Sequence, residues 1–298
     1  MSNLYDNLVV DIAAKHREIN SDPAIKSDLA HKRGLARSFA DKLFFYFKIY
    51  ERLIDSGWYR AWFNEFDEYW IKALGGRKLY FHDFFFLYSS YRTKFQEVGA
   101  GEHIDRGAFL RLWQDPRNVY SIFGAVYKYS LSPFHYWPFR RYLRPGDRVL
   151  EYGCGIAPIT TGLLNDGKDA YHFTIADIPQ FTYHYAKWRL RQFGVKWIDI
   201  DPAALPALEA QYDAVFLCTV LEHLPNPRAV VEHLTAHIKI GGYLMFDYFL
   251  GDGEGLDTIE AVEQRGAVLD YLKANYTMVR GELKYKESMG RTVIQKKT

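Results

Sequence analysis

A short apolar stretch that runs into two glycines constrains the fold of this chain more than any other feature. The segment reads Arg148-Val-Leu-Glu-Tyr-Gly-Cys-Gly-Ile-Ala-Pro158, the pattern of a strand, a turn and the start of a helix. Glycine lets the backbone turn tightly and approach a ligand closely. The following helix offers free N–H groups and the positive end of its dipole. The segment therefore predicts a cradle for a nucleotide-type ligand.

The chain after Pro133 alternates between strand and helix patterns, which is typical of a parallel sheet covered by helices. The predicted strands are Arg148–Tyr152, His172–Ala176, Lys196–Ile200, Ala214–Cys218 and Tyr243–Phe249, with helices at Phe181–Phe193 and Pro227–Ile238. Two further strand-like runs close the chain, Tyr276–Leu283 and Arg291–Lys296. Their connection is too short for a crossover helix, so we expect this pair to be antiparallel.

The first half of the chain predicts helices rich in aromatic residues, which make up 17% of the sequence. Apolar residues recur at three- to four-residue steps, and Gly75-Gly76 ends one such run. The expected helices are Asp28–Ile54, Trp58–Trp70, Leu79–Val98, Asp105–Trp113 and Asn118–Ser130. Most of the aromatic side chains are expected to form helical core. We predict a helical cap that recognises substrate at 1–132 and a sheet domain at 133–298.

Composition narrows the classes of function. The 38 basic and 36 acidic residues nearly balance, which disfavours nucleic acid as a partner. Cys154 and Cys218 have neither disulfide nor zinc spacing, and no metal site is expected. No signal-peptide pattern or apolar run long enough to span a membrane is present, so we expect a cytoplasmic protein. The oligomeric state stays open, a homodimer included.

Acidic residues follow the predicted strands. Glu151 precedes the glycine turn, where it would repel a phosphate and suits a cationic ligand, and Pro158 replaces the third glycine of a dinucleotide motif. Asp177 comes about 20 residues later, where a carboxylate can accept hydrogen bonds from ribose hydroxyls. Asp201 follows the third strand and could accept a hydrogen bond from an adenine amino group. Asp199 is the competing candidate for the same contact.

These elements together resemble the class I S-adenosylmethionine-dependent methyltransferases, in particular the branch that acts on small molecules. The matching segments, in order, are Leu150–Gly155, Ala176–Ile178, Asp201–Pro206 and Leu221–Pro225. The resemblance covers roughly residues 140–298, and Ala157 departs from it where many relatives carry glycine. It implies a doubly wound, Rossmann-like, seven-stranded α/β sheet whose last strand is antiparallel.

The resemblance also implies which residues hold S-adenosylmethionine. Glu151 would lie near the amino-acid end of the cofactor, and Gly153 and Gly155 would bring the backbone to its methionine portion. Asp177 would hold the ribose and Asp201 the adenine amino group. The remaining contacts would come from Ile178 on the adenine face and from Cys218 and Thr219 below the sulfonium.

His223 is the first candidate for a general base, because it follows the fourth strand and its ordinary pKa suits proton removal at neutral pH. The alternative is that His223 only fixes its loop or packs against the cofactor. The predicted acceptor pocket takes Tyr127, Tyr129 and His135 from the run that leads into the sheet domain. Tyr248, at the end of the fifth strand, is the fourth predicted acceptor contact.

The function that this pattern predicts is methyl transfer to an oxygen or nitrogen atom of a small molecule, such as a sugar or a secondary metabolite. Two alternatives stay open. One is a cofactor-binding subunit without catalytic activity, and the other is an NAD-dependent oxidoreductase, against which Glu151 and Pro158 argue.

Overall fold

The chain divides into two compact units. A computed structural model describes residues 10–21, 58–79, 83, 110, 113–115, 119–120, 122–123, 125–126, 136–167, 170–209, 211–250 and 257–297. The first unit comprises residues 1–97 and 115–133, and the second comprises 98–114 and 134–298. Residues 98–114 thus group with the sheet, although they precede the boundary expected from the sequence.

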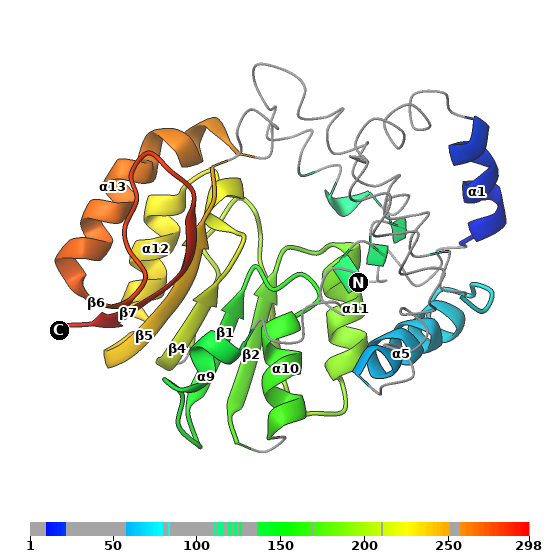
Figure 1. Cartoon of the computed structure of the whole chain (residues 1–298), viewed down its shortest axis with the longest axis horizontal. Coiled ribbons are helices and arrows are strands. Elements are labelled where there is room, and N and C mark those ends of the chain that lie inside the picture. Colours follow the sequence, from blue (N-terminus) through cyan, green and yellow to red (C-terminus); the bar gives the residue numbers. More distant parts are fainter. Residues whose placement is uncertain are drawn as a thin grey trace, which may run out of the picture. The chain divides into compact units, whose positions relative to one another are not determined.

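A seven-stranded sheet forms the second unit (Figure 1). Its strands are β1 (Arg148–Tyr152), β2 (His172–Asp177), β3 (Lys196–Asp199), β4 (Tyr212–Leu217), β5 (Ile238–Tyr248), β6 (Tyr276–Arg280) and β7 (Met289–Lys296). The order is β3-β2-β1-β4-β5-β7-β6. β7 runs antiparallel to β5 and β6, whereas the other neighbours are parallel. The predicted doubly wound sheet with an antiparallel last strand is confirmed.

Helices cover both faces of this sheet, as Figure 1 shows. One face carries α9 (Trp137–Arg140), α10 (Pro158–Asp166) and α11 (Phe181–Leu190), and the other carries α12 (Pro227–Ala236) and α13 (Ile259–Asn275). A short 3-10 helix, η2 (Leu221–His223), follows β4. The two faces have separate apolar cores, because alternate residues of each strand point to opposite sides.

Several element boundaries differ from the prediction, and three of the differences follow from local pairing or turns. α12 ends at Ala236, and Ile238 already pairs with Tyr212, so β5 begins before the Gly241-Gly242 pair. A shift in register between Tyr212 and Ala214 accommodates these extra residues. α11 ends at Leu190 instead of Phe193, because a turn follows it.

The described part of the first unit has an aromatic core. It contains α1 (Ile12–Ser21) and α5 (Trp58–Lys72), and α5 confirms the helix predicted from tryptophan spacing. The ring of Phe123 lies 5.0 Å from that of Phe66 and 4.8 Å from that of Trp70, both at steep angles. The other helices expected in the first half lie wholly or largely outside the described residues.

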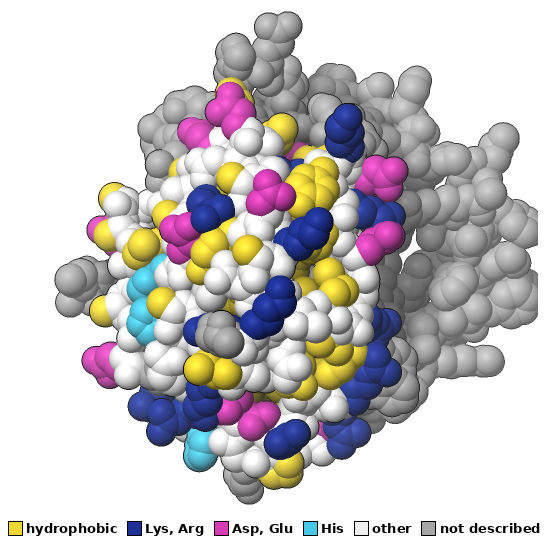
Figure 2. Space-filling view, turned by 90° about the vertical axis from the view of Figure 1, so that its left-hand side faces the viewer, with side chains coloured by type: hydrophobic (Ala, Val, Ile, Leu, Met, Phe, Trp, Pro, Cys, Tyr) yellow, Lys and Arg dark blue, Asp and Glu magenta, His cyan; other side chains and the backbone are white. Residues whose placement is uncertain are grey.

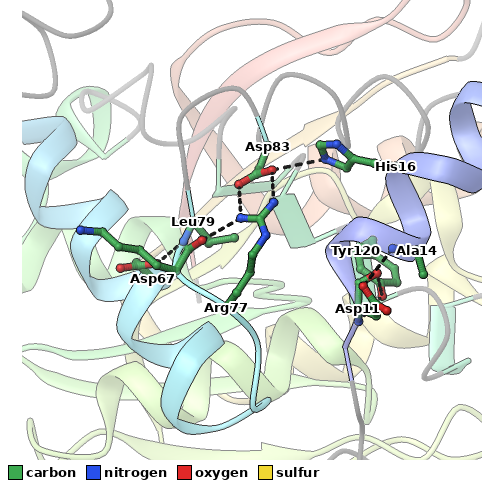
Figure 3. A network of polar contacts seen from close by, with 9 residues as sticks. Asp11, Ala14, His16, Asp67, Arg77, Leu79, Asp83 and Tyr120 are labelled. Atoms are coloured by element: carbon green, nitrogen blue, oxygen red, sulfur yellow. Dashed lines mark hydrogen bonds and ion pairs between the residues drawn. The ribbon is translucent and has the colours of Figure 1, made fainter.

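A buried carboxylate organises the polar contacts of the first unit (Figure 3). Asp83 is fully buried and accepts two hydrogen bonds of 2.9 Å from the Arg77 guanidinium. The Nε2 atom of His16, on α1, lies 3.3 Å from Asp83 Oδ1. Because a buried charge is costly unless it is paired, this network ties α1 to the segment after α5.

Figure 2 shows a mixed surface over α13, β6 and β7, on which basic and acidic side chains are interspersed. The exposed apolar side chains of α13 and β6 are Ile259, Val262, Met278 and Val279. Among the described residues, no helix combines the length and the apolar character that crossing a membrane requires.

Candidate functional site

The glycine turn after β1 lies at the carboxyl edge of the sheet, where the parallel strands β1, β2 and β4 all end. Gly153 and Gly155 have positive φ angles of 65° and 52°, which glycine adopts without strain. A Cβ atom added to Gly153 would lie 2.4 Å from the side chain of Val220, whereas one added to Gly155 would meet nothing within 4 Å. The turn is therefore tightly packed at its first glycine and open at its second.

Glu151 connects β1 to the start of α10. The side chain is only 4% exposed, and its two carboxylate oxygens accept hydrogen bonds from the N–H groups of Ile159 (3.2 Å) and Thr160 (2.8 Å). Burial raises the pKa of this carboxyl from 4.5 to about 7, although the hydrogen bonds to Thr160 and Ile159 oppose the shift. Glu151 thus occupies the position that an anionic ligand would take at a helix N-terminus.

The hydrogen bonds of Glu151 indicate whether the site suits an anionic or a cationic ligand. Two N–H groups of the first turn of α10 are already bonded to Glu151, so a pyrophosphate would have to displace or repel that carboxylate. A carboxylate offers about four acceptor positions, and Glu151 uses one on each oxygen. The remaining capacity suits an ammonium or another cationic group.

Asp177, at the end of β2, is held by three hydrogen bonds. Its Oδ2 accepts from the Gly155 N–H (2.6 Å), and its Oδ1 accepts from the Ile178 N–H (2.7 Å) and from Nε2 of Gln180 (2.9 Å). Burial raises its pKa from 3.8 to about 6, against the opposing effect of these bonds. Only Oδ2 retains an acceptor position, and that position can receive a hydroxyl group.

The acids after β3 differ from Asp177 in exposure. Asp199 pairs with Lys187, whose Nζ lies 2.9 Å from Oδ1, and Asp201 accepts the Ala203 N–H at 2.9 Å within its own loop. Both side chains are exposed. Ile178 is half-buried beside the apolar core on the α12 and α13 face. Asp201 and Ile178 thus stay predictions for adenine contact.

The end of β4 has an unusual backbone. Thr219 has a φ angle of 58°, and its N–H donates to Asp247 Oδ1 at 2.5 Å. The neighbouring Cys218 Sγ lies 3.8 Å from the Met245 carbonyl oxygen, and burial raises the pKa of this thiol well above its ordinary value. The side chain of Cys218 is therefore a packed thiol, and its predicted contact with a ligand would come from the backbone.

His223 lies on η2, close to the side chains of Trp113 and Glu222. Its ring centroid is 6.0 Å from that of Trp113, and its Nε2 is 4.0 Å from Oε1 of Glu222. The side chain keeps 17% of its surface exposed, while Glu222 keeps 3%. The backbone N–H of His223 donates to the Val220 carbonyl at 2.9 Å, which closes the turn. The ring is therefore partly accessible from solvent.

Three of the predicted acceptor contacts, Tyr127, Tyr129 and His135, lie outside the described residues. The fourth, Tyr248, is 1% exposed and its hydroxyl donates to the Ala261 carbonyl at 2.5 Å. The Arg265 guanidinium lies 4.4 Å from its ring centroid. Tyr248 therefore packs on the α13 side of the sheet, and its contact with an acceptor stays a prediction.

Sequence reasoning did not assign roles to Gln180 and Trp113. Gln180 follows Asp177 by three residues and directly precedes α11, and its Nε2 donates to the Asp177 carboxylate. This spacing is visible in the sequence. Trp113 was grouped with the helical core, because nothing in its own segment connects it with His223.

A family model described as a methyltransferase domain matches residues 132–281, about half of the chain. The ubiquinone biosynthesis O-methyltransferase of Bordetella avium is 32% identical over 107 residues, 34% of this chain and 42% of that protein. Its namesake from Marinobacter nauticus is 26% identical over 155 residues, 50% of this chain and 62% of that protein. The chain thus matches only about half the length of these relatives.

Among solved structures, the N-methyltransferase NodS from Bradyrhizobium japonicum, in complex with S-adenosyl-L-homocysteine, is 14% identical with a TM-score of 0.42. The alignment covers 69% of this chain and 98% of that one. A TM-score of this size adds no weight to the sequence match.

The residues at the carboxyl edge fit the cofactor of such proteins. Glu151 has acceptor capacity for an ammonium group, Asp177 Oδ2 has capacity for a ribose hydroxyl, and the backbone at Gly155 faces open space. The buried carboxylates of Glu151 and Asp177 also complement a ligand that carries positive charge.

Proposed function

Because the chain belongs to the family of class I S-adenosylmethionine-dependent methyltransferase domains, we propose that it transfers a methyl group from this cofactor to a small molecule. The single observation that carries this proposal is the bonding of Glu151 to the first turn of α10, which favours a cationic ligand over a phosphate. An oxygen acceptor is favoured over a nitrogen acceptor, because both curated relatives are named O-methyltransferases.

The bound cofactor would supply an electrophilic methyl group on a sulfonium with a good leaving group. The chain then mainly has to hold the reactants close and in line, which can contribute most of the rate enhancement. In this proposal Glu151 holds the amino-acid end of the cofactor and Asp177 its ribose, each through a remaining acceptor position. Their own hydrogen bonds to the backbone keep both carboxylates in place before the cofactor binds.

His223 is proposed to remove the proton from an acceptor hydroxyl. The carboxylate of Glu222 would favour the protonated ring that results, and the contact with Trp113 restrains the ring. A general base of this kind contributes about 10²–10⁴-fold to the rate. The alternative is that His223 only closes the turn after β4, for which its backbone bond to Val220 is sufficient.

Calorimetric titration of the chain with S-adenosylmethionine, S-adenosyl-L-homocysteine and NAD tests the cofactor. We expect the two adenosyl compounds to bind and NAD not to bind; preferential binding of NAD would contradict the proposal. Incubation with methyl-labelled cofactor and panels of phenols, sugars and amines then tests transfer. Binding without transfer to any of these panels would favour the alternative of a cofactor-binding subunit without catalytic activity.

The role of His223 is tested by His223→Ala and His223→Gln once an acceptor is known. A base predicts that both variants lose turnover and keep cofactor affinity, because neither side chain accepts a proton at neutral pH. Unchanged turnover in both variants would leave only the structural role.

A further inference from the structure

The loop after β4 begins with a residue in a costly conformation. Thr219 has a φ angle of 58°, in the left-handed region that β-branched residues rarely adopt. This conformation crowds Cβ against the backbone, and it persists only where surrounding contacts impose it. The contacts that impose it here lie on the neighbouring strand.

Asp247 supplies a direct contact of this kind. It belongs to β5, which runs parallel to β4 with Leu217 opposite Phe246. Its side chain is 4% exposed, and its Oδ1 accepts the Thr219 N–H at 2.5 Å. Leaving a buried backbone N–H without its acceptor is costly, so this hydrogen bond can offset the strain at Thr219.

The left-handed backbone of Thr219 sets the direction in which the chain continues into residues 220–224. Val220, the next residue, packs so closely on Gly153 that a Cβ there would lie 2.4 Å from its side chain. The following turn is closed by the bond from the His223 N–H to the Val220 carbonyl. Further along, Thr258 Oγ1 donates to the Leu224 carbonyl at 2.8 Å. The loop is thus held against the glycine turn at one end and against the start of α13 at the other.

We propose that Asp247 is a positioning residue for cofactor binding, acting through the left-handed backbone of Thr219. It directs the carbonyl groups of Cys218 and Thr219, and sets the turn that carries His223. The cofactor part of this inference rests on the proposed function, whereas the conformation of Thr219 can be measured in the protein without ligand.

The test combines a loss with a rescue. Asp247→Ala removes the acceptor, so Thr219 is expected to relax toward negative φ and the affinity for S-adenosyl-L-homocysteine to fall about tenfold. Thr219→Gly in the same background should recover most of that loss, because glycine adopts positive φ without strain. Calorimetry measures both affinities. Failure of the glycine to restore affinity would mean that Asp247 does not act through Thr219, and would overturn the proposal.

A matched control separates positioning from general stability. Asp213, at the opposite edge of the sheet, also accepts a backbone N–H from a neighbouring strand, that of Arg148 at 2.8 Å. Asp213→Ala should lower the unfolding free energy and leave the affinity for S-adenosyl-L-homocysteine unchanged. If Asp213→Ala weakens binding as much as Asp247→Ala does, the effect is not specific to the β4 loop and the proposal is wrong.

Hydrogen exchange of the Thr219 amide gives a second readout that needs no ligand. We expect strong protection in the wild-type chain and a loss of at least about tenfold in Asp247→Ala, because the N–H loses its buried acceptor. Unchanged protection overturns the proposal. If the wild-type chain binds neither adenosyl compound but shows this change in exchange, the proposed function fails while the control of Thr219 by Asp247 stands.

Discussion

The two edges of the same sheet use aspartate and glutamate in different ways. At the amino edge, Asp213 accepts the Arg148 N–H and pairs with Lys239, whose Nζ lies 2.7 Å from Oδ1. Burial alone would raise the pKa of Asp213, but Lys239 and Arg148 bring it below its ordinary value. At the carboxyl edge, Glu151 and Asp177 are more deeply buried, and their pKa values are raised instead.

The opposite pKa shifts of the acids at the two edges indicate where a cationic ligand is expected. An acid paired with lysine is already neutralised in the folded chain, and its contribution is structural. An acid that is buried and bonded mainly to backbone N–H groups keeps negative charge at a cost, and a cationic ligand would relieve that cost. The criterion separates the buried Glu151 and Asp177 from Asp213, whereas the exposed Asp199, which pairs with Lys187 at the carboxyl edge, behaves like Asp213.

The largest expected effect is on the unfolding free energy when a glycine at either edge is replaced by alanine. Gly153→Ala should lower the unfolding free energy by about 2–4 kcal/mol, since the added Cβ would overlap Val220 as well as forcing a positive φ on alanine. Gly146, at the amino edge, also has a positive φ, of 90°, but a Cβ there meets nothing within 4 Å. Gly146→Ala should therefore cost only about 1–2 kcal/mol. Urea unfolding measures both values, and equal losses would show that the contact with Val220 is unimportant.

The next effect concerns binding. Asp177→Ala should weaken the binding of S-adenosylmethionine by about 1–3 kcal/mol, because a ribose hydroxyl and the Gly155 N–H lose their acceptor. Asp213→Ala is the matched change at the amino edge and should leave affinity within about threefold of wild type. Calorimetry on both variants decides the point. Unchanged affinity in Asp177→Ala would remove its proposed ribose role.

The last prediction is the dependence of stability on pH, which should have opposite signs at the two edges. Glu151 and Asp177 have pKa values raised from 4.5 and 3.8 to about 7 and about 6. Their bound protons therefore stabilise the folded chain at low pH, and this contribution is lost as the pH rises through 6 and 7. Asp213, with a lowered pKa, contributes stability above its ordinary value of 3.8 and loses it as the pH falls further.

Unfolding of the unliganded chain between about pH 5 and pH 8 measures this dependence. Glu151→Gln should flatten the decline, because the higher of the two raised carboxyl pKa values is removed. An unchanged slope in this variant would mean that Glu151 does not titrate in this range. Asp213→Asn is expected to leave the slope between these values of pH as it is.

Sequence patterns predicted the sheet well, because strand and helix periods are local properties. The run around Val215 is continuously apolar and those around Val149 and Phe173 are mostly so, which is typical of strands buried on both faces. The start of β5 was missed, since it depends on the pairing of Ile238 with Tyr212 and on a shift in register. No local pattern contains that information.

The candidate site was predicted only in part for the same reason. Glu151 and Asp177 lie at the carboxyl ends of β1 and β2, so their positions could be inferred from the chain alone. The bond between Asp247 and Thr219 joins two strands, and threonine gives no signal of a left-handed backbone. The contact of Trp113 with His223 likewise joins segments that are distant in sequence.

The division of the chain has a practical consequence for fragment studies. Since residues 98–114 belong with the sheet, the polypeptide leaves the first unit, enters the second, returns, and leaves again. A fragment that starts at residue 134 would carry His223 without the indole of Trp113 beside it. Loss of activity in such a fragment would therefore not report on the first unit alone, because the contact of Trp113 with His223 is lost as well.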